Sequence, residues 1–78
     1  MDVEKKFKEI LADIFRIDVK KIKSSTDFVD DLNAKSIDII ALIAATENEF
    51  GIKTSAEETR KNKTVGQAIA YIKKKLKK

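Results

Sequence analysis

Residues 30–51 read DDLNAKSIDIIALIAATENEFG, and this stretch decides the fold. Its apolar residues recur at intervals of three and four, which is the pattern of a helix with one face toward a core. The glycine at position 51 suits the left-handed residue that closes a helix, so the spacing predicts a helix from Ser36 or Ile37 to about Phe50. Its core-facing residues are Ile39, Leu42, Ile43, Thr46 and Phe50.

The same helix carries a second apolar face, formed by Ile37, Ile40, Ala41 and Ala44. One apolar stripe is enough to attach a helix to a core, so the second face is a candidate partner surface. A helix packed between two neighbours has the same pattern, and periodicity alone leaves both interpretations open.

Two further long helices are predicted, one on each side of the central helix. Asp2 is a suitable cap for a first helix, and Thr64 with Gln67 has the form of a capping box that begins a last helix. The first helix has a buried stripe made of Val3, Phe7, Ile10, Leu11, Ile14 and Phe15. The last helix has one made of Val65, Ala68, Ile69, Ile72 and Leu76.

Residues 16–35 lack helical periodicity and are rich in Ser, Thr, Asp and Asn, which favour turns and caps. Such a long connection needs anchors, and apolar residues are spaced along it like anchors. They are Ile17, Val19, Ile22, Phe28 and Leu32, so we expect an ordered loop. Ser55 is placed to cap a short third helix. The whole pattern predicts an all-α protein: a single domain over residues 1–78, built as a small four-helix bundle with three main helices and a short third one.

The composition argues against catalysis. The 78 residues include no Cys, His, Trp or Pro, which removes thiolate and imidazole metal ligands, Cys nucleophiles and His-based proton transfer. We therefore expect no catalytic and no metal site. No apolar run approaches the roughly 18 residues of a membrane span, and no signal-peptide core begins the chain, so we expect a cytoplasmic protein.

The net charge of +4 hides a strong segregation along the chain. Residues 1–26 carry seven bases and five acids (+2), residues 27–51 one base and six acids (−5), and residues 52–78 nine bases and two acids (+7). A partner that meets the central helix is therefore expected to experience local negative charge.

Three segments of the chain resemble the acyl carrier protein family: DDL at 30–32, AKSID at 34–38 and ENEFGI at 47–52. The similarity extends from about Phe7 to Ile72 without an obvious gap. The family motif is Asp-Ser-Leu, whereas this chain has Lys35-Ser36-Ile37, so a base replaces the acid before the serine. The chain is thus identified as an atypical, basic member of the family.

The resemblance implies that Ser36 accepts 4'-phosphopantetheine from coenzyme A, through a separate phosphopantetheinyl transferase. The arm would hold acyl intermediates as thioesters for acyl-transfer and chain-elongating enzymes of fatty-acid, lipid or polyketide synthesis, and the carrier would act as a monomer. Residue preferences alone suggest a different role for Ser36, because serine is a favoured N-cap and Asp38 suits the positive end of a helix.

In the family, acids of the second helix meet basic patches on partner enzymes, which speeds encounter and orients docking. The matching surface here consists of Lys35, Ile37, Asp38, Ile40, Ala41, Ala44, Glu47 and Asn48. Ala41 and Asn48 stand where acids are usual, and Asn33 replaces a common glycine. With the reversed charge at Lys35, these departures predict a specialised set of partners.

Family members also enclose the acyl chain inside the bundle. The residues placed to line such a cavity here are Phe28, Ile43, Thr46, Asn62, Ala68 and Ile72. Thr46 and Asn62 are polar where the family prefers apolar residues, which would narrow or wet the cavity.

Two alternatives remain open from the sequence. The first is an interaction module that has the carrier fold but is never modified, and Lys35 is its best support. The second is a basic domain that contacts a membrane surface or nucleic acid through the lysines at positions 73–78. Aromatic residues for base stacking are missing among those lysines, which argues against specific nucleic-acid recognition.

Overall fold

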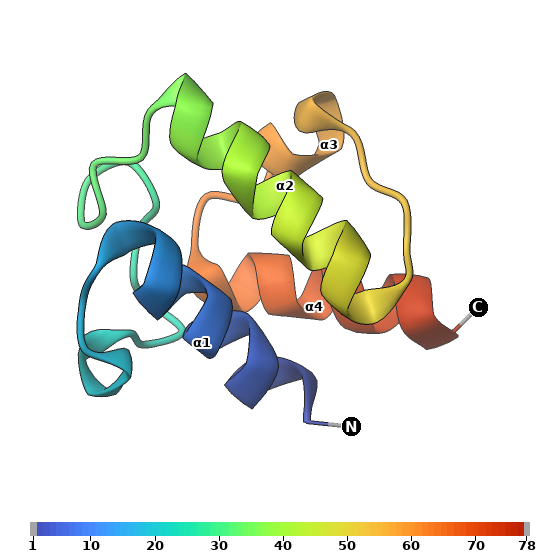
Figure 1. The fold of residues 1–78 in the computed structure, drawn as a ribbon, viewed down its shortest axis with the longest axis horizontal. Helices are drawn as coiled ribbons and strands as arrows, with labels where there is room; N and C mark the ends of the chain where they lie inside the picture. Colours follow the sequence, from blue (N-terminus) through green and yellow to red (C-terminus); the bar gives the residue numbers. More distant parts are fainter. Residues whose placement is uncertain (1, 78) are drawn as a thin grey trace.

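The computed structural model describes residues 2–77, and within them four α-helices surround one apolar core (Figure 1). They are α1 (Val3–Phe15), α2 (Ser36–Phe50), the short α3 (Ala56–Arg60) and α4 (Val65–Lys77), with a 3₁₀-helix η1 (Val19–Lys21) after α1. In Figure 1, α2 crosses the molecule between α1 on one side and α3 on the other, and α4 runs behind. The predicted all-α fold, with a long loop between the first two helices, is confirmed.

The helix ends follow the capping signals in the sequence. The Asp2 carboxylate accepts a hydrogen bond from the Lys5 N–H (3.1 Å), and the Ser55 hydroxyl accepts one from the Glu58 N–H (3.1 Å). Gly51 closes α2 with φ +65°, the left-handed conformation expected of it. These caps satisfy backbone groups that have no partner inside the helices.

The start of α4 is the predicted capping box. The Thr64 hydroxyl accepts from the Gln67 N–H at 3.3 Å, and the Gln67 side-chain oxygen accepts from the N–H groups of Thr64 (3.3 Å) and Lys63 (2.6 Å). The buried stripe of α4 is shorter than predicted. Leu76 is 38% exposed because it lies in the last turn, beyond the reach of the core. Lys78, the end of the predicted lysine run, lies outside the described residues.

The core brings together all four segments that the sequence pattern marks as apolar. Phe7 of α1 and Phe28 of the loop meet edge to face, with ring centroids 6.4 Å apart and an angle of 85° between their planes. The most deeply buried side chains are Phe7, Leu11, Val65 and Ile72.

The loop of residues 16–35 is anchored at both of its ends and in its middle. Ile22 and Phe28 are buried, and Ile17 and Leu32 are half-buried against the core, as predicted. Val19 is not an anchor, because it lies in η1, where it is 38% exposed. The loop is therefore ordered by four apolar contacts instead of the predicted five.

Backbone hydrogen bonds fasten the middle of this loop to the start of α4. Asp27 and Thr64 form an isolated antiparallel bridge, the Phe28 N–H donates to the Lys63 carbonyl (3.1 Å), and the Gly66 N–H donates to the Ser24 carbonyl (2.9 Å). A Cβ atom at Gly66 would lie 3.1 Å from that carbonyl oxygen, so the close approach favours glycine. The loop that leads into α2 is thus hydrogen-bonded to the start of α4, more than 30 residues later in the chain.

No helix within residues 2–77 has the length and apolar character needed to span a lipid bilayer.

Candidate functional site

Ser36 is the first residue of α2, and its side chain is exposed. The N-cap position belongs to Lys35, whose N–H donates to the Asp38 carboxylate at 3.0 Å. The interpretation of Ser36 as the cap is therefore wrong, because α2 already begins at Ser36 and the N-cap lies one residue earlier. The role expected for Asp38 at the positive end of the helix is confirmed. The Ser36 hydroxyl thus sits at a helix start without a capping task.

A turn with left-handed backbone precedes this site. Asn33 has φ +53°, which explains why it can replace a glycine, since asparagine tolerates this conformation better than most residues. The Ala34 N–H donates to the Phe28 carbonyl at 2.8 Å, which holds the last residues before the helix against the loop. The turn fixes where Ser36 emerges.

The surroundings of Ser36 suit a phosphate ester. A groove of about 590 Å³ opens beside the serine, and its lining includes four cations and no acid, namely Lys35, Arg60, Lys61 and Lys63. The N-terminus of a 15-residue helix adds its positive dipole end and free backbone N–H groups. A phosphodiester on the Ser36 oxygen would therefore meet favourable charge from α2, from α3 and from the segment before α4.

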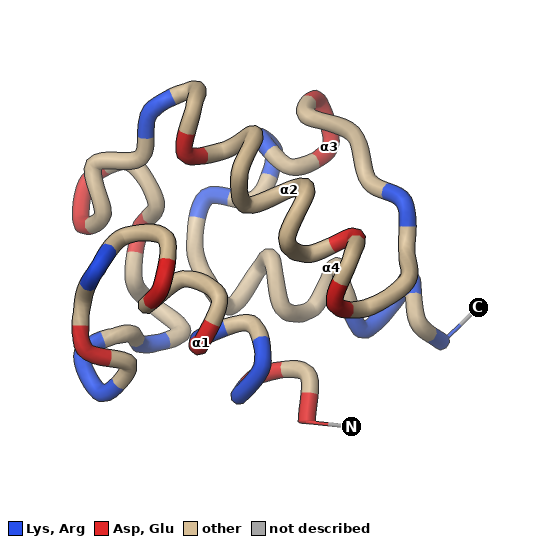
Figure 2. Tube along the Cα trace, viewed as in Figure 1, with Lys and Arg blue, Asp and Glu red and all other residues tan. Residues whose placement is uncertain are grey.

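The second apolar face of α2 is exposed to solvent. Ile37 and Ile40 are 73% and 64% exposed, and Ala41, Ala44 and Asn48 are also exposed. Within residues 2–77 this face is not packed between two neighbours, so that interpretation is wrong. Asp38 and Glu47 are half-buried at either end of the face. Figure 2 shows the result on α2: acidic positions near the two ends and an uncharged middle.

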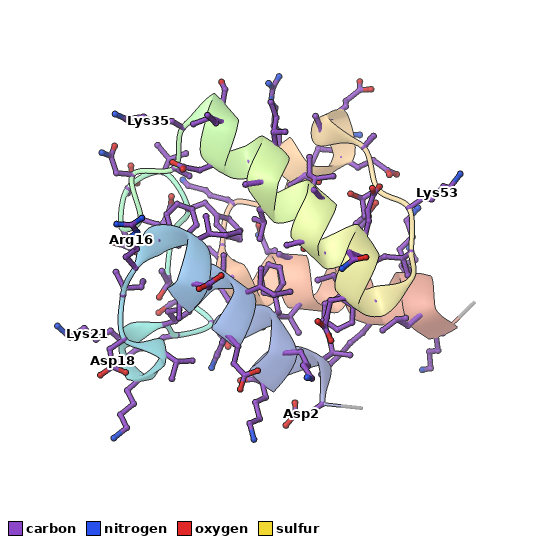
Figure 3. The ribbon with its side chains drawn as sticks, in the orientation of Figure 1. Asp2, Arg16, Asp18, Lys21, Lys35 and Lys53 are labelled. Carbon is purple, nitrogen blue, oxygen red and sulfur yellow. The ribbon has the colours of Figure 1, made fainter. Side chains whose placement is uncertain are left out.

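Two of the charged residues expected to meet partners have distinct settings. The Lys35 side chain projects away from the start of α2 (Figure 3). The Glu47 carboxylate accepts a hydrogen bond from the Thr54 N–H at 2.7 Å, so it also holds the segment between α2 and α3. Lys35 is therefore free to meet a partner, whereas Glu47 has a structural task as well.

All six residues expected to line an acyl cavity lie around one cavity in the bundle. Its volume is about 20 Å³, which is about the space of one water molecule. Five further residues complete the lining: Phe7, Leu42, Thr54, Thr59 and Tyr71. The cavity and the groove beside Ser36 share Phe28, Leu42, Thr59 and Asn62. These four residues therefore lie between the groove and the cavity.

Sequence reasoning missed Thr54 and Tyr71. The Thr54 hydroxyl oxygen is buried and has no hydrogen-bond partner within residues 2–77. Neither residue belongs to a periodic apolar stripe, so the pattern gave no reason to place them inside the bundle. Tyr71 also lies only two positions before Lys73, the first of the terminal lysines.

Tyr71 fastens α3 to α4. Its hydroxyl donates to the Glu58 carboxylate at 2.7 Å, and Lys75 lies 3.8 Å from the same carboxylate and 5.6 Å from the centre of the Tyr71 ring. Burial, and then the hydrogen bond to Glu58, raise the pKa of Tyr71 to about 12. The hydrogen bond from Tyr71, and then the charge of Lys75, lower the pKa of Glu58. One terminal lysine is thus occupied within the chain.

Residues 2–77 contain no cluster of three or more His, Cys, Asp or Glu side chains that would hold a metal ion.

Comparisons with known proteins agree on one family. Residues 5–72 match the model of the phosphopantetheine attachment site. The chain is 48% identical over 77 residues to the acyl carrier protein of Buchnera aphidicola subsp. Schizaphis graminum, covering 99% of this chain and 98% of that protein. It is 46% identical over 71 residues to the acyl carrier protein of Clostridium acetobutylicum, covering 91% and 92% of the two chains.

A solved structure of an acyl carrier protein from Enterococcus faecalis, described for its high thermal stability, has the same fold. The two superpose with a TM-score of 0.80 at 34% identity, over 95% of this chain and 94% of that one. The family match and these relatives span nearly the whole chain. The chain therefore belongs to the acyl carrier protein family, and it is a non-catalytic carrier of acyl groups linked to phosphopantetheine.

Proposed function

We propose that Ser36 is the residue to which 4'-phosphopantetheine is attached. The observation that carries this proposal is an exposed serine hydroxyl, free of a capping task, at the first residue of a long helix and beside a groove lined by cations. Both the helix end and these cations favour a phosphodiester. When bound, the group supplies the thiol on which acyl groups are carried as thioesters.

The attachment needs no base from this chain. A bond forms between the Ser36 oxygen and the pantetheine-side phosphorus of coenzyme A, and the pyrophosphate bond breaks. Adenosine 3',5'-bisphosphate leaves, and the serine proton passes to a base of the transferase. What this chain contributes is a hydroxyl in a fixed position and a positive surface for the substrate phosphates.

The test is the intact mass after incubation with coenzyme A and a broad-specificity phosphopantetheinyl transferase. We expect one addition to the parent chain and none to Ser36→Ala. Ser25→Ala is the matched control, because Ser25 is an exposed serine in the loop and its removal should leave the addition unchanged. A folded parent that gains no mass with several transferases would instead favour the module that is never modified.

We also propose that the face of α2 beside Ser36 docks a dedicated set of partners, in fatty-acid, lipid or polyketide synthesis in the cytoplasm. The face combines apolar Ile37 and Ile40 with a cation at one end and acids at either end. A partner that fits it has an acidic group opposite Lys35. Partners built for a uniformly acidic helix would meet repulsion there.

Exchanging one charge tests this specialisation. Lys35→Asp is expected to speed modification by generic transferases and chain elongation by generic ketosynthases, because it removes the repulsion while Arg60, Lys61 and Lys63 remain beside Ser36 for the phosphates. Lys53→Asp is the matched control, since Lys53 is exposed on the segment between α2 and α3 and points away from the site (Figure 3). Unchanged rates with Lys35→Asp would remove the basis for a specialised partner set.

A further inference from the structure

We propose that the cavity beneath α2 favours acyl chains that bear a carbonyl or hydroxyl oxygen along the chain over saturated chains of equal length. The inference rests on the proposed function, because it names the substrate class of the same carrier. The observation that carries it is the buried Thr54 hydroxyl oxygen, which has no hydrogen-bond partner within residues 2–77. Such a group is costly in a core, and native proteins rarely keep one without a role.

The Thr54 hydroxyl is held in place and not simply carried by a loose segment. The backbone N–H of Thr54 donates to the Glu47 carboxylate on α2 at 2.7 Å. The residue lies in the lining of the cavity, together with Phe7, Ile43 and Ile72. An acyl chain that enters this space meets a residue held in place, in a lining that is mainly apolar.

Three more polar side chains line the same space. Thr46 is only 5% exposed on the core face of α2, while Thr59 and Asn62 line both the cavity and the groove beside Ser36. The rest of the lining is mainly carbon. A few polar groups among apolar walls are typical of sites that fix the orientation of a partly polar ligand.

Because the cavity is small, the contacts that an acyl chain gains on insertion decide whether it stays inside. At about 20 Å³ it must open before any acyl chain can enter. We expect it to open on the side of α3, which has five residues, buries none of them and is tied to α4 by the hydrogen bond from Tyr71 to Glu58. A saturated chain in the opened cavity would leave the Thr54 hydroxyl unpartnered, so insertion would gain apolar contacts only. A carbonyl oxygen of the chain within reach would accept the missing hydrogen bond, and a chain hydroxyl would accept or donate it. Either bond shifts the equilibrium toward the inserted acyl chain.

The test compares matched acyl groups on the same protein. The phosphopantetheinylated chain is loaded with hexanoyl, 4-oxohexanoyl or 5-oxohexanoyl groups, and the loading is verified by mass. The rate of thioester cleavage by dithiothreitol, which exchanges with the thioester and forms no oxime with the chain ketone, then reports how much of the time the chain is exposed, after division by the rate for the same acyl group on free pantetheine. We expect at least one oxo chain to be protected about fivefold better than hexanoyl, which is the effect of one net hydrogen bond.

The variant Thr54→Val is the matched control, because it keeps the shape of the side chain and removes the oxygen. We expect it to abolish the preference for the oxo chain and to leave the protection of hexanoyl unchanged. Equal protection of all three acyl groups in the parent would overturn the inference while leaving the carrier function intact. A preference that persists in Thr54→Val would equally overturn it. If Ser36 never accepts the arm, the mass shows this before any cleavage is measured, and both proposals fall.

Discussion

Replacing Thr54 by valine is expected to stabilise the protein that has no arm attached. The change removes a buried hydroxyl oxygen without a partner and adds a methyl group of similar size, while the N–H bond to Glu47 is kept. An unsatisfied buried hydroxyl costs about 1–3 kcal/mol, so the free energy of unfolding should rise by about that amount. For a domain of this size, each kcal/mol corresponds to roughly 4–8 °C in Tm.

Urea unfolding followed by far-UV circular dichroism measures this gain. With a slope of about 1 kcal/mol per M, the midpoint should move up by about 1 M or more. Thr59→Val is the matched control, since Thr59 lines the same cavity and is half-buried like Thr54, but its hydroxyl oxygen is not a buried one without a partner. Its midpoint should stay within the error of the parent. A midpoint for Thr54→Val that is unchanged or lower would refute the reasoning, because it would mean that the hydroxyl is satisfied.

Three other changes have definite expected outcomes. Gly51→Ala should cost about 1–2 kcal/mol in urea unfolding, since φ is +65° and an added Cβ would meet nothing within 4 Å, so the loss is purely conformational. Tyr71 is the only tyrosine and the chain has no Trp, so an absorbance titration of the phenolate should give a pKa of about 12, and Glu58→Gln should lower it. Because this pKa is raised on folding, its contribution to stability is complete below about pH 10 and is lost as the pH rises through about 12. Asp27→Ala should cost about 1–3 kcal/mol, because it strands two backbone N–H groups that donate to the carboxylate at 2.9 Å, and Asp27→Asn should retain part of that stability.

The helices were predictable because the capping residues and the apolar stripes in the sequence indicate the same helices that the core requires. The caps at Asp2, Ser55 and Thr64 and the glycine at position 51 set the ends of the helices, and the apolar stripes set their buried faces. Where the stripe ran past the core, as at Leu76, periodicity overestimated burial, because a pattern carries no information on where the neighbouring helix stops.

The interior of the candidate site was harder to predict from capping residues and apolar periodicity. Capping preference favoured Ser36, but the N-cap of α2 is Lys35, whose N–H donates to the Asp38 carboxylate, and residue preference alone does not fix a helix start to one position. Thr54 lies in a segment without periodicity, and its burial depends on the bond to Glu47, seven positions earlier. Contacts of this kind are set by the tertiary fold.

The bridge between Asp27 and Thr64 has a consequence for the order of events during synthesis. The two residues are 37 positions apart (64 − 27), so the loop before Ser36 acquires its fastening only after the start of α4 has left the ribosome. Until then a nascent chain exposes the serine next to a loop that lacks its backbone hydrogen bonds to the start of α4. A transferase that reads the shape of this turn, and not its sequence, would pass over such unfinished chains and modify folded ones.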